Sequence, residues 1–391
     1  MNSPFPFART LIAIWILLFV PRPAWAESPP ALPDLGHLQK VDAIIEEAIA
    51  QGKCPGAVLY VGLHDQPLYR KAYGFRSLVP QKVAMTPDTI FDLASLTKPI
   101  ATSTCIMVLA DRGKLAVSEK VAKYLPAFGN HGKEDITIEQ LLLHRAGLIP
   151  DNPISDFDKG SAAGLAAIFD SSPKWPPGSR FAYSDVGFIV LGQVVEAVDG
   201  RSLDRFAEEE VFTPLGMRDT TYNPPTALRE RIAATETRGG KPMTGEVHDP
   251  RAFAMKGVAG HAGLFSTADD LARFCRMILH RGSLDGRRMM SEAMANAWIA
   301  PRYFPDGSNG RTYGFDVATP YSSPRGDRFE KGQTFGHTGF TGTSVWIDPR
   351  HDCFVILLTN SVHPDGKGNV IGLRRKVSTL VAEAILGPKA P

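Results

Sequence analysis

The sequence is poor in cysteine, and its few cysteines are widely spaced. Cys54, Cys105, Cys275 and Cys353 are scattered along the chain, and no two of them form a CxxC pair. This spacing disfavours a zinc ribbon and a thioredoxin-type redox site. Each cysteine stands among apolar neighbours, so the sequence leaves open whether they form disulfides or remain buried free thiols.

The sequence also lacks an excess of charge of one sign. It contains 43 Lys and Arg residues against 41 Asp and Glu residues, with no basic block. Removal of a leader that contains Arg9 and Arg22 leaves 41 residues of each sign. A chain without net charge has no electrostatic footprint for nucleic acid or for an anionic membrane, so neither is an expected partner.

The first 26 residues have the pattern of a secretory signal peptide. Arg9 precedes an apolar run over 11–20, and Ala24-Trp25-Ala26 has the small residues of a cleavage site. The run is short for a transmembrane helix, although an uncleaved anchor stays an alternative. No cysteine stands directly after the cut, which excludes a lipoprotein. We therefore expect a periplasmic or secreted protein of residues 27–391 without a stable membrane span.

Both ends of the remaining chain carry the periodicities of an α/β structure. The predicted elements are a helix over 38–50, strands over 57–62 and 67–74, strands over 343–347 and 353–359, and a helix over 369–385. The middle is mostly helical: a capping box at 137–140 opens a helix, apolar spacing predicts another over 185–198, and 266–269 opens a third.

These elements predict an α/β (α+β) fold in one domain over 27–391. An antiparallel sheet is built from both chain ends and flanked by the terminal helices, because this buries their apolar faces. We assign about 34–110 and 310–391 to this α/β part, and about 111–309 to an inserted, mostly helical subdomain. There is no internal repeat and no low-complexity segment.

A serine and a lysine stand three residues apart in FDLASLTKPIATST, residues 91–104. Positions i and i+3 share one face of a helical turn, so Ser95 Oγ and Lys98 Nζ can meet. Pro99 favours a tight start, since its ring is tolerated near a first turn. We predict that burial lowers the pKa of Lys98, so that its neutral amine accepts the Ser95 proton.

The same tetrad has an ordinary interpretation. Lys98 could extend to solvent while Ser95 caps the helix. Ser171 and Lys174 repeat the spacing in the loop SSPKWPPG, which shows that the tetrad alone is weak support for catalysis. The chain also has no G-x-S-x-G elbow, which disfavours the conventional esterase route.

Two other segments supply groups that a serine acyl-transfer site needs, namely a second proton-handling group and backbone donors. Tyr183 and Asp185 stand two apart before an apolar helix, where both can face a cleft. His337-Thr338-Gly339 is predicted at the start of a strand, where Gly339 lets a substrate approach the backbone. The alternatives are a core tyrosine, a helix N-cap and a hydrogen-bonded core histidine.

In this order, Ser95-Leu96-Thr97-Lys98, Tyr183-Ser184-Asp185 and His337-Thr338-Gly339 resemble the three motifs of the serine β-lactamase and penicillin-binding family. The resemblance is to the class C β-lactamase-like branch, which also contains D,D-peptidases and esterases. The stretches LLLHRAGL, PPGSRFAYSD, PLGMRDT and GHAGLFSTADDLARF strengthen it. The similarity spans about Leu38 to Leu386.

The resemblance implies roles for individual residues. Ser95 is the expected nucleophile, Lys98 its base partner, and Tyr183 the group that relays the proton to the leaving atom. The backbone N–H groups of Ser95 and Phe340 are expected to form the oxyanion hole, and Thr338 to line the anionic end of the substrate. No metal or cofactor is implied.

Two positions depart from the commonest family pattern. Asp185 stands where asparagine is usual; an ionised carboxylate cannot donate, and its charge favours a protonated Lys98. His337 stands where lysine is usual; it is largely neutral near pH 7 and binds a carboxylate less firmly. Both changes disfavour efficient β-lactam hydrolysis and suit a peptide or ester hydrolase.

Three further residues, His248, Asp249 and His261, suggest a metal site at first sight. Their spacing fits no ligand pair borne by one helix or strand, so we predict a loop bordering the cleft instead. His144 in LLLHRAGL is expected to close a helix end.

The sequence as a whole predicts an exported serine hydrolase that forms an acyl-enzyme on Ser95. The expected activity is that of a β-lactamase-related D,D-peptidase (carboxypeptidase) or esterase, acting on a small-molecule or peptidoglycan-derived ester or amide. The alternatives are a true β-lactamase and a non-catalytic penicillin-binding or cell-wall sensor module.

Overall fold

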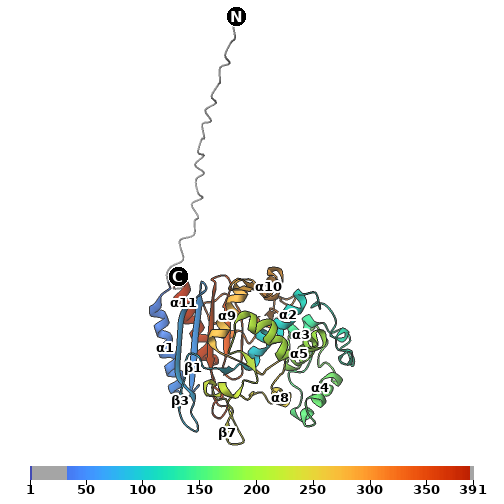
Figure 1. Cartoon of the computed structure of the whole chain (residues 1–391), viewed down its shortest axis with the longest axis horizontal. Helices are drawn as coiled ribbons and strands as arrows, with labels where there is room; N and C mark the ends of the chain where they lie inside the picture. The colour runs from blue at the N-terminus through green and yellow to red at the C-terminus, as the bar shows by residue number, and fades with distance from the viewer. Residues whose placement is uncertain (2–32, 388–391) are drawn as a thin grey trace.

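The computed structural model describes residue 1 and residues 33–387 (Figure 1). The predicted signal peptide therefore lies, apart from residue 1, outside the described residues. An eight-stranded antiparallel sheet forms the centre of the molecule, with the order β11-β12-β13-β14-β15-β1-β2-β3. The strands are β1 (Gly56–Leu63), β2 (Gln66–Ser77), β3 (Val83–Ala84), β11 (Gly310–Arg311), β12 (Asp316–Ala318), β13 (Phe335–Thr338), β14 (Ser344–Asp348) and β15 (Cys353–Thr359).

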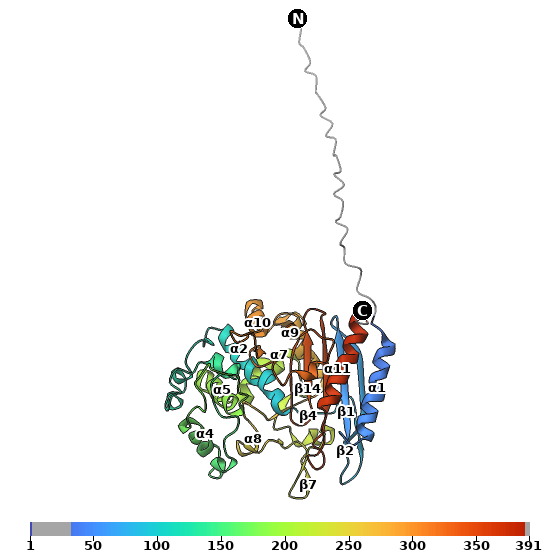
Figure 2. The same cartoon turned by 180° about the vertical axis from the view of Figure 1, so that it is seen from behind.

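The two chain ends meet in the middle of this sheet, where β1 pairs with β15 from Ala57↔Thr359 to Leu63↔Cys353. Successive residues of β1 point to opposite faces. Leu59 and Val61 pack with the terminal helices α1 (Leu35–Ala50) and α11 (Ile371–Leu386), which lie side by side (Figure 2). Val58 and Tyr60 belong to the core on the other face, where α9 (Ala268–Leu279) packs on β1 and β15. The predicted fold class is confirmed.

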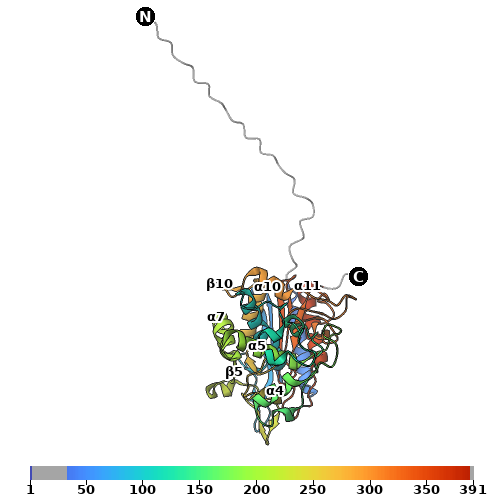
Figure 3. The same ribbon diagram turned by 90° about the vertical axis from the view of Figure 1, so that its right-hand side faces the viewer.

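The remaining helices are found mostly beyond α9, on the side away from α1 (Figure 1). They are α2 (Thr104–Asp111), α3 (Ile138–Leu142), α4 (Ser161–Asp170), α5 (Asp185–Asp199), α6 (Leu203–Ala207), α7 (Thr213–Leu215), α8 (Pro250–Ala254) and α10 (Glu292–Ile299). The predicted capping box of α3 is present, with Thr137 and Gln140 bonded reciprocally. α5 runs through the middle of this part and is buried along most of its length (Figure 3).

Short strands complete the structure. A three-stranded sheet in the order β4-β8-β5 joins the chain segment directly before Ser95 to the helical part. Its strands are β4 (Phe91–Asp92), β5 (Thr221–Tyr222) and β8 (Leu264–Ser266), and two small hairpins are formed by β6 (Thr237–Arg238) with β7 (Lys241–Pro242) and by β9 (Ser283–Leu284) with β10 (Arg287–Arg288).

The four cysteines are all buried free thiols, which settles the alternative that the sequence left open. Burial raises the pKa of the Cys54 thiol to about 12. Thiolate chemistry is therefore disfavoured at this residue. Between residues 33 and 387, no helix is long and apolar enough to cross a membrane.

Candidate active site

The turn that carries Ser95 is built from an unusual backbone. Ala94 has φ +46°, a conformation that residues with a side chain rarely adopt. The carboxylate of Asp92, only 2% exposed, accepts a hydrogen bond from Ala94 N at 2.8 Å and another from His248 N at 2.7 Å. Asp92 thereby ties the turn before Ser95 to the loop that precedes α8.

Ser95 and Lys98 follow in two tight turns before α2. Ala94–Leu96 is a 3₁₀ turn and Lys98–Ser103 a π-helical turn, with Pro99 at its start as predicted. Short π-helical segments within helices occur frequently at functional sites. In contrast, Ser171 has extended backbone angles of φ −71° and ψ 152°, so the second copy of the tetrad forms no helical turn.

Lys98 is fully buried and its amine contacts three oxygen atoms. Nζ lies 2.9 Å from Ser95 Oγ, 3.0 Å from the backbone oxygen of His261 and 2.7 Å from Asp185 Oδ1. The predicted contact between Ser95 and Lys98 is therefore present, and the alternative in which Lys98 extends to solvent is wrong.

The predicted lowering of the Lys98 pKa is also wrong. Burial does lower this pKa, but the charge of Asp185 and the neighbouring Tyr183 outweigh it, and the pKa is raised above its ordinary value. The opposing prediction, that the Asp185 carboxylate favours a protonated Lys98, is confirmed. In the resting site Lys98 is an ammonium ion that donates hydrogen bonds to Ser95 Oγ and to the His261 backbone oxygen and forms an ion pair with Asp185.

Tyr183 lies beside this ammonium, with its ring centroid 5.0 Å from Lys98 Nζ. His144 holds the segment in place: its ring packs 4.4 Å from that of Tyr183, and its Nδ1 accepts a hydrogen bond from Ser184 N at 3.1 Å. Ser184, not Asp185, is the N-cap of α5, so the alternative role of Asp185 as a cap is wrong. Burial raises the pKa of Tyr183, although the charge of Lys98 opposes this rise.

His337-Thr338-Gly339 ends strand β13 instead of opening a strand, which corrects the prediction. His337 is 5% exposed, and burial holds its pKa well below the ordinary value, so its predicted neutrality is confirmed. Nδ1 donates to Thr338 O at 2.8 Å, which leaves Nε2 as an acceptor. The close approach at Gly339 is made by the protein itself, since a Cβ there would lie 2.3 Å from Leu93 O.

A cavity of about 520 Å³ brings the three motifs together. Its wall includes Ser95, Tyr183, His337, Thr338, Gly339 and Phe340, all expected at the site. Phe340 is 72% exposed at the rim, where its ring stacks on His248 with centroids 5.6 Å apart. Lys98 and Asp185 do not line this cavity but stand directly behind Ser95.

The cavity also contains two arginines that the sequence reasoning missed. Arg311 is 1% exposed and pairs with Asp316 at 3.3 Å. Arg374, 7% exposed, donates to Gly339 O at 2.7 Å and to Thr343 O at 2.9 Å, and among the described residues it forms no ion pair. Burial lowers its pKa to about 10, so it is charged at neutral pH. Its helical spacing to Val377 and Val381 was the available signal of burial.

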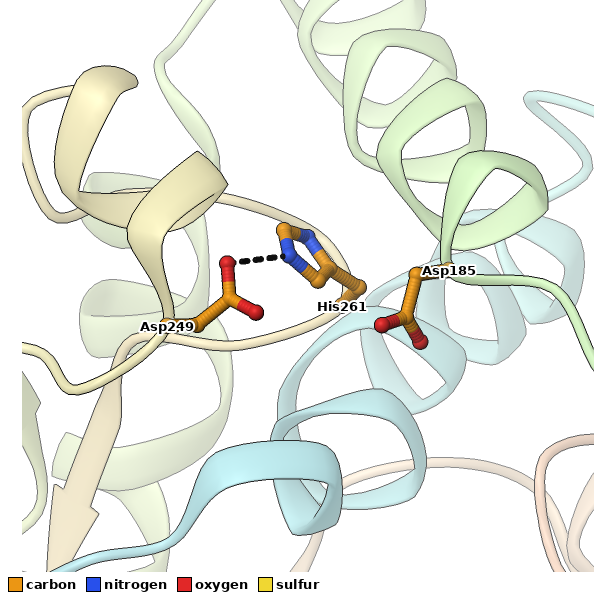
Figure 4. A group of neighbouring side chains, drawn as sticks. All are labelled: Asp185, Asp249 and His261. Atoms are coloured by element: carbon orange, nitrogen blue, oxygen red, sulfur yellow. Dashed lines mark hydrogen bonds and ion pairs between the residues drawn. The ribbon is translucent and has the colours of Figure 1, made fainter. Parts of the chain in front are cut away.

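Asp185, Asp249 and His261 form the group drawn in Figure 4, and their side-chain ligand atoms lie within 4.8 Å of one another. Spacing along the chain gave no sign of this group, because Asp185 joins Asp249 and His261 only in the folded structure. However, His261 Nε2 contacts Asp249 Oδ1 at 2.9 Å, and the Asp185 carboxylate already forms an ion pair with Lys98. A cation would have to displace both contacts.

The fold and the site together define an active-site serine hydrolase. The chain matches the β-lactamase family model over residues 41–377 and belongs to that family. The reading of the three motifs as those of the β-lactamase and penicillin-binding family is therefore confirmed.

The chain is similar to proteins that are named as an amidase and as a carboxypeptidase. It is 34% identical over 370 residues to an N-acetylmuramyl-L-alanine amidase of Bacillus subtilis (strain 168), covering 83% of this chain and 81% of that protein. It is 32% identical over 386 residues to a protein of Escherichia coli (strain K12) named as a D-alanyl-D-alanine carboxypeptidase, covering 87% and 86%. A penicillin-binding protein homologue from Caulobacter crescentus superimposes with a TM-score of 0.71 at 26% identity, over 91% and 99% of the chains.

Proposed function

We propose that this protein is an exported D,D-peptidase that cleaves its substrate through an acyl-enzyme on Ser95. The observation that carries the proposal is the 2.9 Å contact between Lys98 Nζ and Ser95 Oγ at the wall of the cavity. The names of the relatives, an amidase and a carboxypeptidase, support an amide as substrate. Export rests on the signal pattern of residues 1–26.

In the first step Ser95 Oγ attacks the carbonyl carbon of the scissile amide. The Oγ–C bond forms, the C–N bond breaks, and the Ser95 proton passes to the Tyr183 hydroxyl, which gives its own proton to the leaving nitrogen. Lys98 stabilises the negative charge that develops on Oγ. This revises the role of Lys98 from base to cation. Water then attacks the ester along the reverse proton route and releases the acyl product.

The oxyanion formed in this step needs preorganised donors. Between residues 33 and 387, neither Ser95 N–H nor Phe340 N–H has a hydrogen-bond acceptor in the protein. Both amides flank the cavity that contains the nucleophile. This supports the assignment of the oxyanion hole to these two groups.

The charge of the cavity favours a peptide with a terminal carboxylate over a neutral ester. His337 is neutral and its Nε2 is an acceptor, so it cannot supply a positive charge to the substrate. Arg374 stands behind Gly339 on the same wall, and its guanidinium forms no ion pair with any residue that the structure describes. Thr338, which stands between His337 and Gly339 in the chain, is proposed to contact the terminal carboxylate of the substrate.

Intact-mass measurement over time tests the proposal. The protein is incubated with a serine-directed phosphonate and, separately, with a penicillin, and any adduct is mapped to a peptide. A lasting adduct on the peptide that contains Ser95 is the expected result. A fleeting adduct with hydrolysed penicillin would favour a β-lactamase, and a phosphonate adduct elsewhere or none at all would contradict the proposed nucleophile.

Replacing Asp185 with asparagine is expected to lower the pKa of Lys98. The amide keeps the size of the side chain but removes the charge that outweighs burial. As pH rises, the ammonium is then lost at a lower pH, so the alkaline limb of the acylation rate should move to lower pH. The measurement is the phosphonate acylation rate across pH. Movement of the acid limb to lower pH would instead show that neutral Lys98 acts as a base.

A further inference from the structure

The amine of Lys98 depends on a loop that lies outside the three motifs. A lysine side chain has a flexible four-carbon stem, so its direction is set by the groups that its amine contacts. Two of these contacts, Ser95 and Asp185, belong to the motifs, and the third is the backbone oxygen of His261. The position of that oxygen therefore helps to determine where the ammonium points.

The loop is packed tightly between the nucleophile helix and α5. Thr102 Oγ1 donates to Gly260 O at 2.7 Å, one turn beyond Lys98. On the other side, a Cβ at Gly260 would lie 1.9 Å from Phe188 O, so only glycine fits against α5. The backbone next to His261 is thus held on two sides.

The side chain of His261 provides the remaining restraint. It is 1% exposed, and its Nε2 lies 2.9 Å from Asp249 Oδ1 (Figure 4). The same Asp249 oxygen accepts from Ala252 N at 2.8 Å and caps α8, so the carboxylate is itself fixed. The pair with His261 lowers the pKa of Asp249 despite its burial, which keeps the carboxylate ionised.

The buried pair of His261 and Asp249 carries a cost in folding free energy that an apolar pair would not have. Among the described residues His261 Nδ1 has no hydrogen-bond partner, and a buried polar atom without a partner costs about 1–3 kcal/mol. An apolar side chain would fill the space without this cost. The hydrogen bond to Asp249 is therefore the feature that distinguishes histidine from an apolar residue here.

We propose that Asp249 and His261 are positioning residues, whose hydrogen bond holds the His261 carbonyl so that it aims Lys98 at Ser95. This inference rests on the proposed acyl-enzyme function. Neither residue touches the reacting atoms. Their effect passes through the loop backbone to the Lys98 amine.

The test compares variants that break the bond with variants that keep it. His261→Phe and Asp249→Ala remove the bond, whereas His261→Gln keeps a donor and Asp249→Asn keeps both an acceptor and a helix cap. The matched control is Asp348→Ala, because it removes a 2.8 Å pair between an aspartate and a histidine, Asp348 and His351, at the end of β14 opposite to Ser344. For each, the rate and the concentration dependence of phosphonate acylation are measured with the thermal midpoint.

The breaking variants are expected to acylate about 10- to 100-fold more slowly at saturating phosphonate, as a misaimed catalytic group does. The half-saturating concentration should stay within about twofold, since the cavity wall is unchanged. His261→Gln and Asp249→Asn, which keep the hydrogen bond, should acylate at nearly the wild-type rate. The double variant His261→Phe/Asp249→Ala should be no slower than the slower of the two single variants, because the same bond is lost in each case.

Several results would overturn the proposal. One is wild-type acylation in both breaking variants; another is an equal loss in Asp348→Ala, which would indicate general destabilisation. Stoichiometric metal in the purified protein that is lost in His261→Phe would make these residues ligands instead. If the wild type does not acylate at Ser95, the proposed function fails first, and that result is visible before any variant is made.

Discussion

Replacement of Ser95 by alanine is expected to abolish the covalent adduct and to lower turnover at least about 10⁴-fold. The reaction makes and breaks its bonds at Oγ, the hydroxyl oxygen that lies 2.9 Å from Lys98 Nζ. Lys98 Nζ would keep two of its three oxygen contacts, those to His261 and Asp185, so the fold should persist. Intact mass with a phosphonate and turnover of a D-Ala-D-Ala peptide are the measurements.

The chain supplies a matched control for this variant. Ser171 begins the second Ser-x-x-Lys tetrad, but its hydroxyl donates to Ile168 O at 2.8 Å at the end of α4. Ser171→Ala should therefore keep both the adduct and the turnover of the wild type. If the adduct persisted in Ser95→Ala but disappeared in Ser171→Ala, the nucleophile would be Ser171, and the assignment to Ser95 would be wrong.

Replacement of Lys98 by methionine is expected to slow acylation about 10³-fold, the effect of removing one preorganised donor from a developing charge. Methionine is similar in length and suits the buried position, but it donates no hydrogen bond to Ser95. The rate of phosphonate acylation measures the loss. Lys174→Met, in the exposed second tetrad, is the matched control and should acylate at the wild-type rate.

The same variant should also be less stable. Asp185, 19% exposed at its side chain, would lose its cation, at a cost of about 1–3 kcal/mol in the free energy of unfolding. The double variant Lys98→Met/Asp185→Asn removes the stranded carboxylate, so it should regain stability without regaining acylation. Urea unfolding and acylation are measured on the same samples. Recovery of acylation in the double variant would contradict the role of Lys98 as a cation.

The prediction of the fold succeeded where the signals are local. Short continuous apolar runs in β1 and β15, which are buried on both faces, and helical spacing in α1 and α11 follow from the geometry of strands and helices. The contact between Ser95 and Lys98 is local too, because i and i+3 meet in one turn wherever that turn lies. The strand position of His337-Thr338-Gly339 was misplaced by a few residues, since a sequence marks strand ends poorly.

The prediction failed where distant charges decide the outcome. The sequence predicted two opposed effects on the pKa of Lys98, a lowering by burial and a rise by the Asp185 charge, and the 2.7 Å approach of Asp185 from the start of α5 decides for the rise. Arg374 was missed for a similar reason: its helix was predicted, but the cavity that it lines is formed by β13 and distant loops. In the sequence analysis, Asp249 and His261 were named as possible metal ligands. Neither their hydrogen bond to each other nor their proximity to Asp185 could be predicted from the sequence.

The sequence by itself determined the sheet built from both chain ends, the order of the three motifs and the family to which they belong. Each of these depends on residues close together in the chain or on their order along it. The protonation of Lys98, the single cavity wall shared by Ser95, His337 and Arg374, and the restraint by His261 were decided only by the tertiary structure. Electrostatic energy depends on distance in space, and the distances between segments far apart in the chain exist only after folding.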